Sequence, residues 1–181
     1  MARVALGVWL MACLLAPARA TTLERLSLDE MIVKSTAIIR GRVLSSQAIS
    51  HNNLVYTHFK VQVLERWKGP NEAVADVAVP GGKAGKLRQS YAGAPELTEG
   101  GEYLLFLWTG RSGLTQVIGF SQGAMTLAKD GKGDLVVTRA ASRELMLDPR
   151  TGQPVADAAV LMRLREMSDR IARTLAQGAR Q

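Results

Sequence analysis

The sequence from Ser35 to Pro70, STAIIRGRVLSSQAISHNNLVYTHFKVQVLERWKGP, decides the fold. It contains two long runs in which apolar and polar residues alternate, and a period of two predicts half-buried antiparallel strands. The expected inner faces carry Ala37, Ile39, Gly41 and Val43 in the first run and Val55, Phe59, Val61 and Val63 in the second. The expected outer faces carry Arg40 and Arg42, and Tyr56, His58, Lys60 and Gln62. Between the runs, His51-Asn52-Asn53 supplies residues that tolerate turn dihedrals, so the stretch predicts a long β-hairpin.

Residues 1–20 have the pattern of an export signal. Arg3 precedes an apolar run of about twelve residues, and Ala18-Arg19-Ala20 matches the small-x-small cleavage pattern. A membrane span is the alternative, but it needs about twenty apolar residues. We therefore expect cleavage after Ala20, a mature chain that begins at Thr21, and a periplasmic or secreted protein without a transmembrane segment. A lipoprotein signal ending at Cys13 is a second alternative, in which Met11 is an unusual residue.

Removal of the signal changes the composition. Cys13 is the only cysteine, so the mature chain forms neither a disulfide nor a thiolate metal site. Of the 23 Lys and Arg residues, Arg3 and Arg19 lie in the signal, so 21 basic residues face 16 acidic ones and the net charge is +5. That mild charge is typical of a solvated basic surface, and most aromatic residues fall at expected core positions. We expect no nucleic-acid partner.

Shorter elements surround the long hairpin. Ser27-Leu28-Asp29-Glu30 is a capping box that predicts a short helix to about Lys34. Further strands are expected at 73–79, 103–108, 114–120, 124–128 and 135–138, whereas 83–91 is either a weak strand or a surface loop. A helix is expected from 156 to 177, with an apolar stripe made of Val160, Leu164, Met167, Ile171 and Leu175. The stripe is expected to pack on the sheet; a membrane surface or a partner is the alternative.

Seven short strands with little helix predict a closed or nearly closed antiparallel barrel of the OB-fold type, because closure removes exposed strand edges. The expected fold is mainly β, with a short N-terminal helix and an amphipathic C-terminal helix. The expected organisation is a signal peptide at 1–20, an OB-like barrel domain with its N-terminal helix at 21–145, and a turn and C-terminal helix at 146–181.

The run from Ala37 to Val43, together with Tyr56 and Trp67-Lys68-Gly69-Pro70, resembles the opening strands of the tissue inhibitors of metalloproteinases and related netrin-type modules. The resemblance covers about 35 residues and implies an OB-fold barrel. The arrangement also resembles exported bacterial proteins of unknown activity that have a helix before the barrel. The inhibitor family begins its mature chain with a zinc-chelating cysteine, whereas this chain is expected to begin Thr21-Thr22. The inhibitory site is therefore not carried over, and protease inhibition remains an alternative function.

Residues suited to catalysis are sparse. The only histidines are His51, in the expected turn, and His58, on a polar strand face, and both are expected to be solvated. No Gly-x-Ser-x-Gly occurs, and Ser121 lacks the first glycine of that motif. A hydrolase needs a nucleophile, a base and an orienting group within reach of one another. We therefore expect no enzyme, no cofactor and no metal site, with a hydrolytic enzyme as the less favoured alternative.

The segment from Gly81 to Arg88 contains three glycines and three cations in eight residues. Its Gly-Lys lacks the spacing and the following Ser or Thr of a phosphate-binding P-loop. Glycine N–H groups beside cations can still hold an anion. The candidate ligand-binding residues are Gly81, Gly82, Lys83, Lys86 and Arg88. The sequence thus predicts a non-catalytic binding module for an unknown protein or anionic ligand, and the alternative is a mobile loop whose charges only keep the protein soluble.

Overall fold

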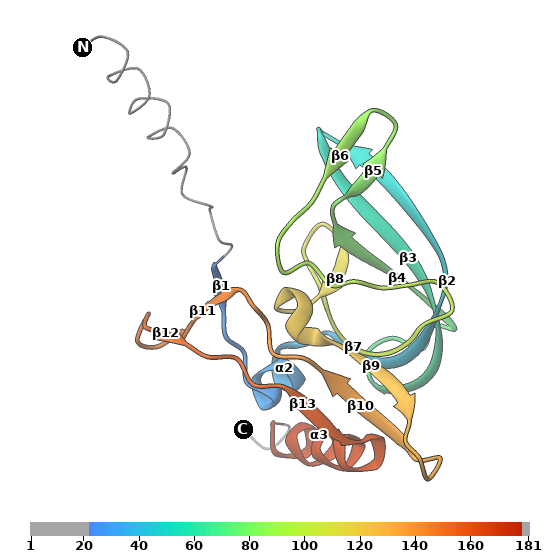
Figure 1. Ribbon diagram of the computed structural model, residues 1–181. Helices are drawn as coiled ribbons and strands as arrows, with labels where there is room; N and C mark the ends of the chain where they lie inside the picture. The colour runs from blue at the N-terminus through green and yellow to red at the C-terminus, as the bar shows by residue number, and fades with distance from the viewer. Residues whose placement is uncertain (1–21, 179–181) are drawn as a thin grey trace, which may run out of the picture.

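The long hairpin is present as β2 (Ala37–His51) and β3 (Leu54–Lys68) in the computed structural model, which describes residues 22–178 (Figure 1). Asn52 and Asn53 join the strands with φ angles of 49° and 63°, as a two-residue type I′ turn requires. The predicted alternation is confirmed, since Ile39 and Val61 are buried and Gln62 is exposed. The expected signal peptide and the start at Thr21 lie outside the described residues.

The fold is mainly β, as predicted, and is built around one large sheet. Its strand order is β13-β10-β9-β7-β2-β3-β4-β8. The strands not yet introduced are β4 (Val74–Pro80), β7 (Glu102–Thr109), β8 (Thr115–Val117), β9 (Ala124–Lys129), β10 (Leu135–Arg139) and β13 (Val160–Arg163). Strand β8 pairs antiparallel with β7 and also parallel with β4, where Ala78 lies opposite Gln116. The two ends of the run from β7 to β4 are therefore linked through β8.

Two small sheets accompany the large one. Strands β5 (Gly82–Ala84) and β6 (Leu87–Gln89) form a hairpin, so the weak-strand interpretation of 83–91 is confirmed over these residues. Strands β1 (Thr22–Glu24), β11 (Leu145–Leu147) and β12 (Pro154–Val155) form a three-stranded sheet near the N-terminal end of the described chain (Figure 1). Strands of two or three residues are too short to produce a detectable period in the sequence.

The core lies on both faces of the large sheet. On one face, inner residues of β2, β3, β4, β7 and β8 form a cluster that includes Ile39, Val61 and Leu105. On the other face, the helices α2 (Leu28–Lys34) and α3 (Leu164–Gly178) cover a second cluster that includes Phe106 and Met125. Strand β7 contributes to both clusters, which explains its continuous apolar run.

The predicted capping box of α2 is confirmed. The Ser27 N–H donates to Glu30 Oε2 at 2.8 Å, and the Glu30 N–H donates to Ser27 Oγ at 3.2 Å. Helix α2 is also tied to α3, because the Arg170 guanidinium donates to both Asp29 carboxylate oxygens at 2.9 and 3.0 Å. Those hydrogen bonds, together with the Arg170 charge, hold the pKa of Asp29 below its ordinary value although partial burial raises it. Neither helix of residues 22–178 combines the length and the apolar character needed to cross a bilayer.

The predicted start of the C-terminal helix at residue 156 is wrong. Residues 160–163 form β13, paired antiparallel with β10, and α3 begins only at Leu164. Val160 and Met162 point to the helix-covered cluster at a spacing of two, as strand residues do. The rest of the stripe packs on the sheet as expected, since Met167 and Ile171 are fully buried within it.

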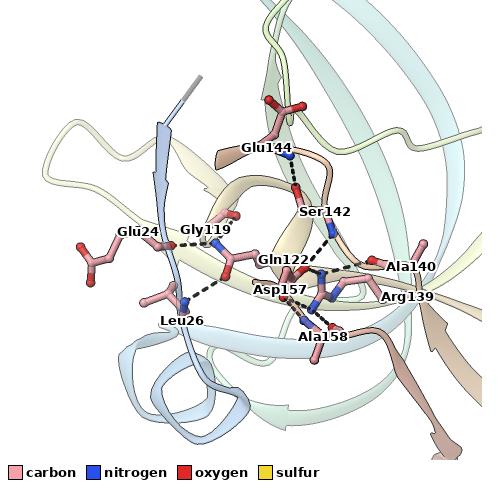
Figure 2. Close-up of polar contacts among 10 residues, drawn as sticks. All are labelled: Glu24, Leu26, Gly119, Gln122, Arg139, Ala140, Ser142, Glu144, Asp157 and Ala158. Atoms are coloured by element: carbon pink, nitrogen blue, oxygen red, sulfur yellow. Dashed lines mark hydrogen bonds and ion pairs between the residues drawn. The ribbon is translucent and has the colours of Figure 1, made fainter. Parts of the chain in front are cut away.

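The strand expected at 114–120 is also shorter than predicted and ends at Val117. Gly119 and Phe120 adopt left-handed φ angles of 64° and 58°, which no strand can continue. They lead into the 3₁₀ turn η1 (Phe120–Gly123). The fully buried Gln122 side chain holds this turn, accepting from the Leu26 N–H at 2.9 Å and donating to the Glu24 and Gly119 carbonyls (Figure 2).

A second buried polar contact fixes the chain between β10 and β13 (Figure 2). The Arg139 and Asp157 side chains, 9% and 4% exposed, form an ion pair, and Asp157 also accepts from the Ser142 and Ala158 N–H groups. Burial raises the pKa of Asp157, but the hydrogen bonds and charge of Arg139 and the backbone donors outweigh it and leave the pKa below its ordinary value.

Candidate ligand-binding site

The predicted ligand-binding segment forms the β5–β6 hairpin. This hairpin packs against the half of β2 and β3 that lies next to the turn joining them (Figure 1). Four hydrogen bonds hold its base to β3 and to the turn before it. The Gly81 N–H donates to the Val55 carbonyl and the Thr57 hydroxyl donates to the Gly81 carbonyl, both at 2.8 Å. The Gln89 amide accepts from the Val55 N–H and donates to the Asn53 carbonyl, both at 2.7 Å. The hairpin therefore has a fixed orientation.

The glycines of the segment serve to place the hairpin. Gly81 and Gly82 have φ angles of 105° and 125°, in the region that favours glycine. A Cβ atom on Gly82 would lie 2.4 Å from Thr57 Oγ1, whereas one on Gly85 would have no neighbour within 4 Å. Gly82 thus faces β3 at close range, and Gly85 supplies the left-handed residue of the turn. Neither of the first two glycines presents an open face to solvent.

The cations of the segment do face solvent. Lys83 lies directly opposite Arg88 in the hairpin register, so both side chains project from the same face. The next pair, Gly82 and Gln89, faces β3, so Lys83 and Arg88 point away from it. Both are exposed, as is Lys86 in the turn. Within residues 22–178, no carboxylate lies within ion-pair distance of these three cations.

A groove that the sequence does not reveal adjoins the hairpin. Its first part, which we name the polar hollow, has a volume of about 330 Å³ and lies between the hairpin base and the segment 94–97. Its second part, which we name the apolar hollow, has a volume of about 210 Å³ and lies at the ends of β4, β7 and β8. Pro80 and Pro95 line both hollows, so the two lie next to each other. The lining residues come from five separate segments, and no local pattern could have indicated them.

The remaining candidates from the sequence lie apart from this groove. His58 Nδ1 lies 3.1 Å from Asp76 Oδ1 on the outer face of β3 and β4, and Lys60 Nζ lies 2.9 Å from Asp76 Oδ2. Burial raises the pKa of Asp76, but the hydrogen bonds and charges of Lys60 and His58 lower it by more, so the pKa lies below its ordinary value. His51 is exposed at the end of β2, and Ser121 belongs to η1.

In the part of the chain that the structure describes, no group of three or more His, Cys, Asp or Glu side chains is placed to hold a metal ion.

Comparison of the chain with protein-family models, with curated proteins and with solved structures finds no match. A proposal about function therefore rests on the geometry of the β5–β6 hairpin and the groove beside it.

Proposed function

We propose that the mature chain is an exported, non-catalytic binding module on an OB-like barrel, and that the β5–β6 hairpin binds an anionic ligand. The support for the barrel is the order of strand pairing. Strands β7, β2, β3 and β4 pair in succession, and β8 pairs with both β4 and β7, so the pairing returns to its first strand. A ring of five strands is the number in an OB-fold, and each of the five pairs with two others of the ring.

The support for export is in the first twenty residues, whose apolar run and Ala18-Arg19-Ala20 site fit a cleaved signal. An exported module meets acidic polysaccharides and acidic protein segments rather than nucleic acid. These two classes are the ligands that the proposal assigns to the hairpin.

The single observation that carries the proposal is the Lys83–Arg88 pair. Like charges directly opposite each other destabilise an antiparallel pair. Some cations of the large sheet have acidic cross-strand neighbours: Arg40 Nε lies 2.6 Å from Glu102 Oε1, and Lys60 Nζ lies 2.9 Å from Asp76 Oδ2. In the hairpin, by contrast, two cations lie directly opposite each other. A local departure of this kind is expected at functional sites, and a bound anion removes the repulsion.

Salt dependence is a consequence of this mode of binding. The cations are exposed, so their attraction for an anion is screened over about 8 Å at physiological ionic strength and over longer distances in dilute buffer. A polyanion should be retained at low salt and released as the salt concentration rises. The hairpin alone therefore supplies orientation and a fast on-rate more than affinity.

The test is retention on immobilised heparin and on immobilised polyglutamate at low salt. The triple variant Lys83→Ala, Lys86→Ala, Arg88→Ala is expected to lose retention without a change in Tm. The matched control is Arg111→Ala, Lys129→Ala, Lys132→Ala, which removes the same charge from three other exposed cations. This control should elute close to the wild type. Equal elution of the two triple variants would show that net charge, and not the hairpin, causes retention.

A further inference from the structure

We propose that the groove beside the hairpin binds an extended acidic segment of a partner protein, and that one aromatic side chain of that segment occupies the apolar hollow. The inference rests on the proposed binding of anions by the β5–β6 hairpin and assigns the class of the ligand. The hairpin would hold the acidic residues, and the hollow would hold the side chain that fixes the register.

The apolar hollow is built around Trp108. Its walls include Pro80, Pro95, Ile118 and Phe120. Trp108 is 46% exposed at the end of β7, a high value for tryptophan, the residue type with the largest side chain. The ring lies against Gly110, where a Cβ atom would be 3.0 Å from its Cη2 and Cζ3 atoms. A rigid, exposed aromatic ring costs little entropy when it binds a partner.

The wall opposite β4 is held in a conformation that needs support. Phe120 has a φ of 58°, which is an outlier for a bulky residue. The neighbouring contacts enforce it: the Ser121 N–H donates to the Gly93 carbonyl at 3.0 Å, and Gln122 Nε2 donates to the Gly119 carbonyl at 3.1 Å. Backbone outliers that the surrounding structure enforces concentrate at binding sites. The strain here places an aromatic side chain at the edge of the hollow.

The size and chemistry of the hollow favour one apolar side chain. Its volume of about 210 Å³ is below the range of about 300–1,000 Å³ typical of small-molecule sites. Apart from the indole N–H of Trp108, Gln116 supplies the only polar side chain among the residues that line it. A sugar ring placed there would leave hydroxyl groups without partners, which is unfavourable. An aromatic anchor in a small pocket is the usual form of a binding hot spot between proteins.

The positive charge of the hairpin favours acidic residues in the rest of the bound segment. The polar hollow leads from Pro80 and Pro95 to Gly81, Gln89 and Tyr91 at the hairpin base. The Lys83–Arg88 pair does not line the hollow but is the next pair along the hairpin, on its other face. An extended segment that follows this groove would bring acidic residues to the cations and an aromatic residue to Trp108. Glu96 also lines the polar hollow, and it repels acidic residues placed over it. The acidic residues must therefore lie on the hairpin side, and Glu96→Gln should tighten binding.

The test uses two kinds of synthetic peptide and isothermal titration calorimetry at low salt with the mature protein. One probe is hexaglutamate; the others carry a phenylalanine separated from hexaglutamate by one, three or five glycines. At least one phenylalanine peptide should bind about 10-fold more tightly than hexaglutamate, as burial of one aromatic side chain provides. In Trp108→Ala that gain should disappear while hexaglutamate binding is unchanged. Leu161→Ala, which removes an exposed apolar residue from β13, is the control and should keep the gain.

The outcomes separate the two proposals. Binding of hexaglutamate with no gain from any phenylalanine peptide, or a gain that persists in Trp108→Ala, overturns the groove inference and leaves anion binding by the hairpin intact. Phenylalanine peptides that bind equally well to the triple hairpin variant also overturn it, because the segment then makes no use of the cations. Absence of binding by every peptide overturns the inference that the ligand is an acidic segment, and retention on heparin then decides whether the hairpin binds anions at all.

Discussion

The side chains of Lys83 and Arg88 project from the same face of the β5–β6 hairpin as directly opposed cross-strand neighbours. An opposite-charge pair at such a position contributes roughly 0.2–1 kcal/mol, whereas a like-charge pair is destabilising. The hairpin is therefore less stable than the same hairpin would be with an opposite-charge pair at positions 83 and 88. We attribute that loss of stability to the proposed binding of anions by the two cations.

The first prediction concerns this exchange of stability for binding. Lys83→Glu places a carboxylate opposite Arg88 and should stabilise the protein by about 0.5 kcal/mol in urea unfolding. The same change should remove retention on heparin at low salt. A Lys83→Glu protein that is less stable than the wild type by more than this amount would mean that the two side chains do not face each other.

The second prediction concerns the close packing of the hairpin base. Gly82→Ala should destabilise the hairpin, because its Cβ would lie 2.4 Å from Thr57 Oγ1 and its φ of 125° suits glycine alone. Gly85→Ala, at a φ of 60° with open space around it, should cost only about 1 kcal/mol. Amide hydrogen exchange of residues 82–89 measures the difference. Equal exchange rates in the two variants would contradict the packing of Gly82 against β3.

The third prediction concerns the core. Val61 is fully buried, whereas its neighbour Gln62 is exposed on the outer face of β3. Val61→Asp should cost about 3 kcal/mol or more, a large share of the ~5–15 kcal/mol that stabilises a domain. Gln62→Asp should change Tm by a degree or two at most, on the order of an ordinary surface substitution. Similar losses of Tm in both variants would show that the strand faces are assigned wrongly.

The fourth prediction concerns the buried pair of Arg139 and Asp157. Asp157→Asn leaves the Arg139 charge uncompensated and should cost about 3–5 kcal/mol at pH 7. The folded pKa of Asp157 lies below the unfolded value, so the carboxylate contributes its full stability above that unfolded value and loses it as pH falls through the folded pKa. The difference between wild type and Asp157→Asn should therefore shrink below about pH 4.

Urea unfolding between pH 7 and pH 2 measures this difference. The double variant Arg139→Met, Asp157→Asn removes the unpaired charge while an amide oxygen remains for the Ser142 N–H, and it should recover most of the loss. A gap between wild type and Asp157→Asn that is constant over the whole pH range would contradict the account of this pair.

The long hairpin could be predicted from the sequence because its period of two extends over many residues of β2 and β3. The start of the C-terminal helix could not. Val160 and Leu164 have helical spacing, yet Val160 is held in β13 by pairing with Arg139, a contact between distant parts of the chain. Non-local pairing of this kind overrides a local pattern.

The candidate site likewise has one feature that the sequence indicated and others that depend on the folded chain. The composition of the segment 81–88 indicated a basic, glycine-rich site, but the opposition of Lys83 and Arg88 depends on a register that the turn at Gly85 sets. The apolar hollow had no local signal, because Pro80, Trp108 and Phe120 meet only in the folded chain. A left-handed Phe120 is set by tertiary contacts and is not a property of its neighbours in sequence.

We propose that the β5–β6 hairpin is the anion-binding surface of this protein. The most direct measurement is a titration of the isotope-labelled mature protein with hexaglutamate at low salt, followed by the backbone amide shifts in NMR spectra. The account predicts that the largest shifts fall on residues 81–89 and vanish when Lys83, Lys86 and Arg88 are replaced by alanine. Shifts centred on the β9–β10 turn or on α3, with residues 81–89 unmoved, would contradict it.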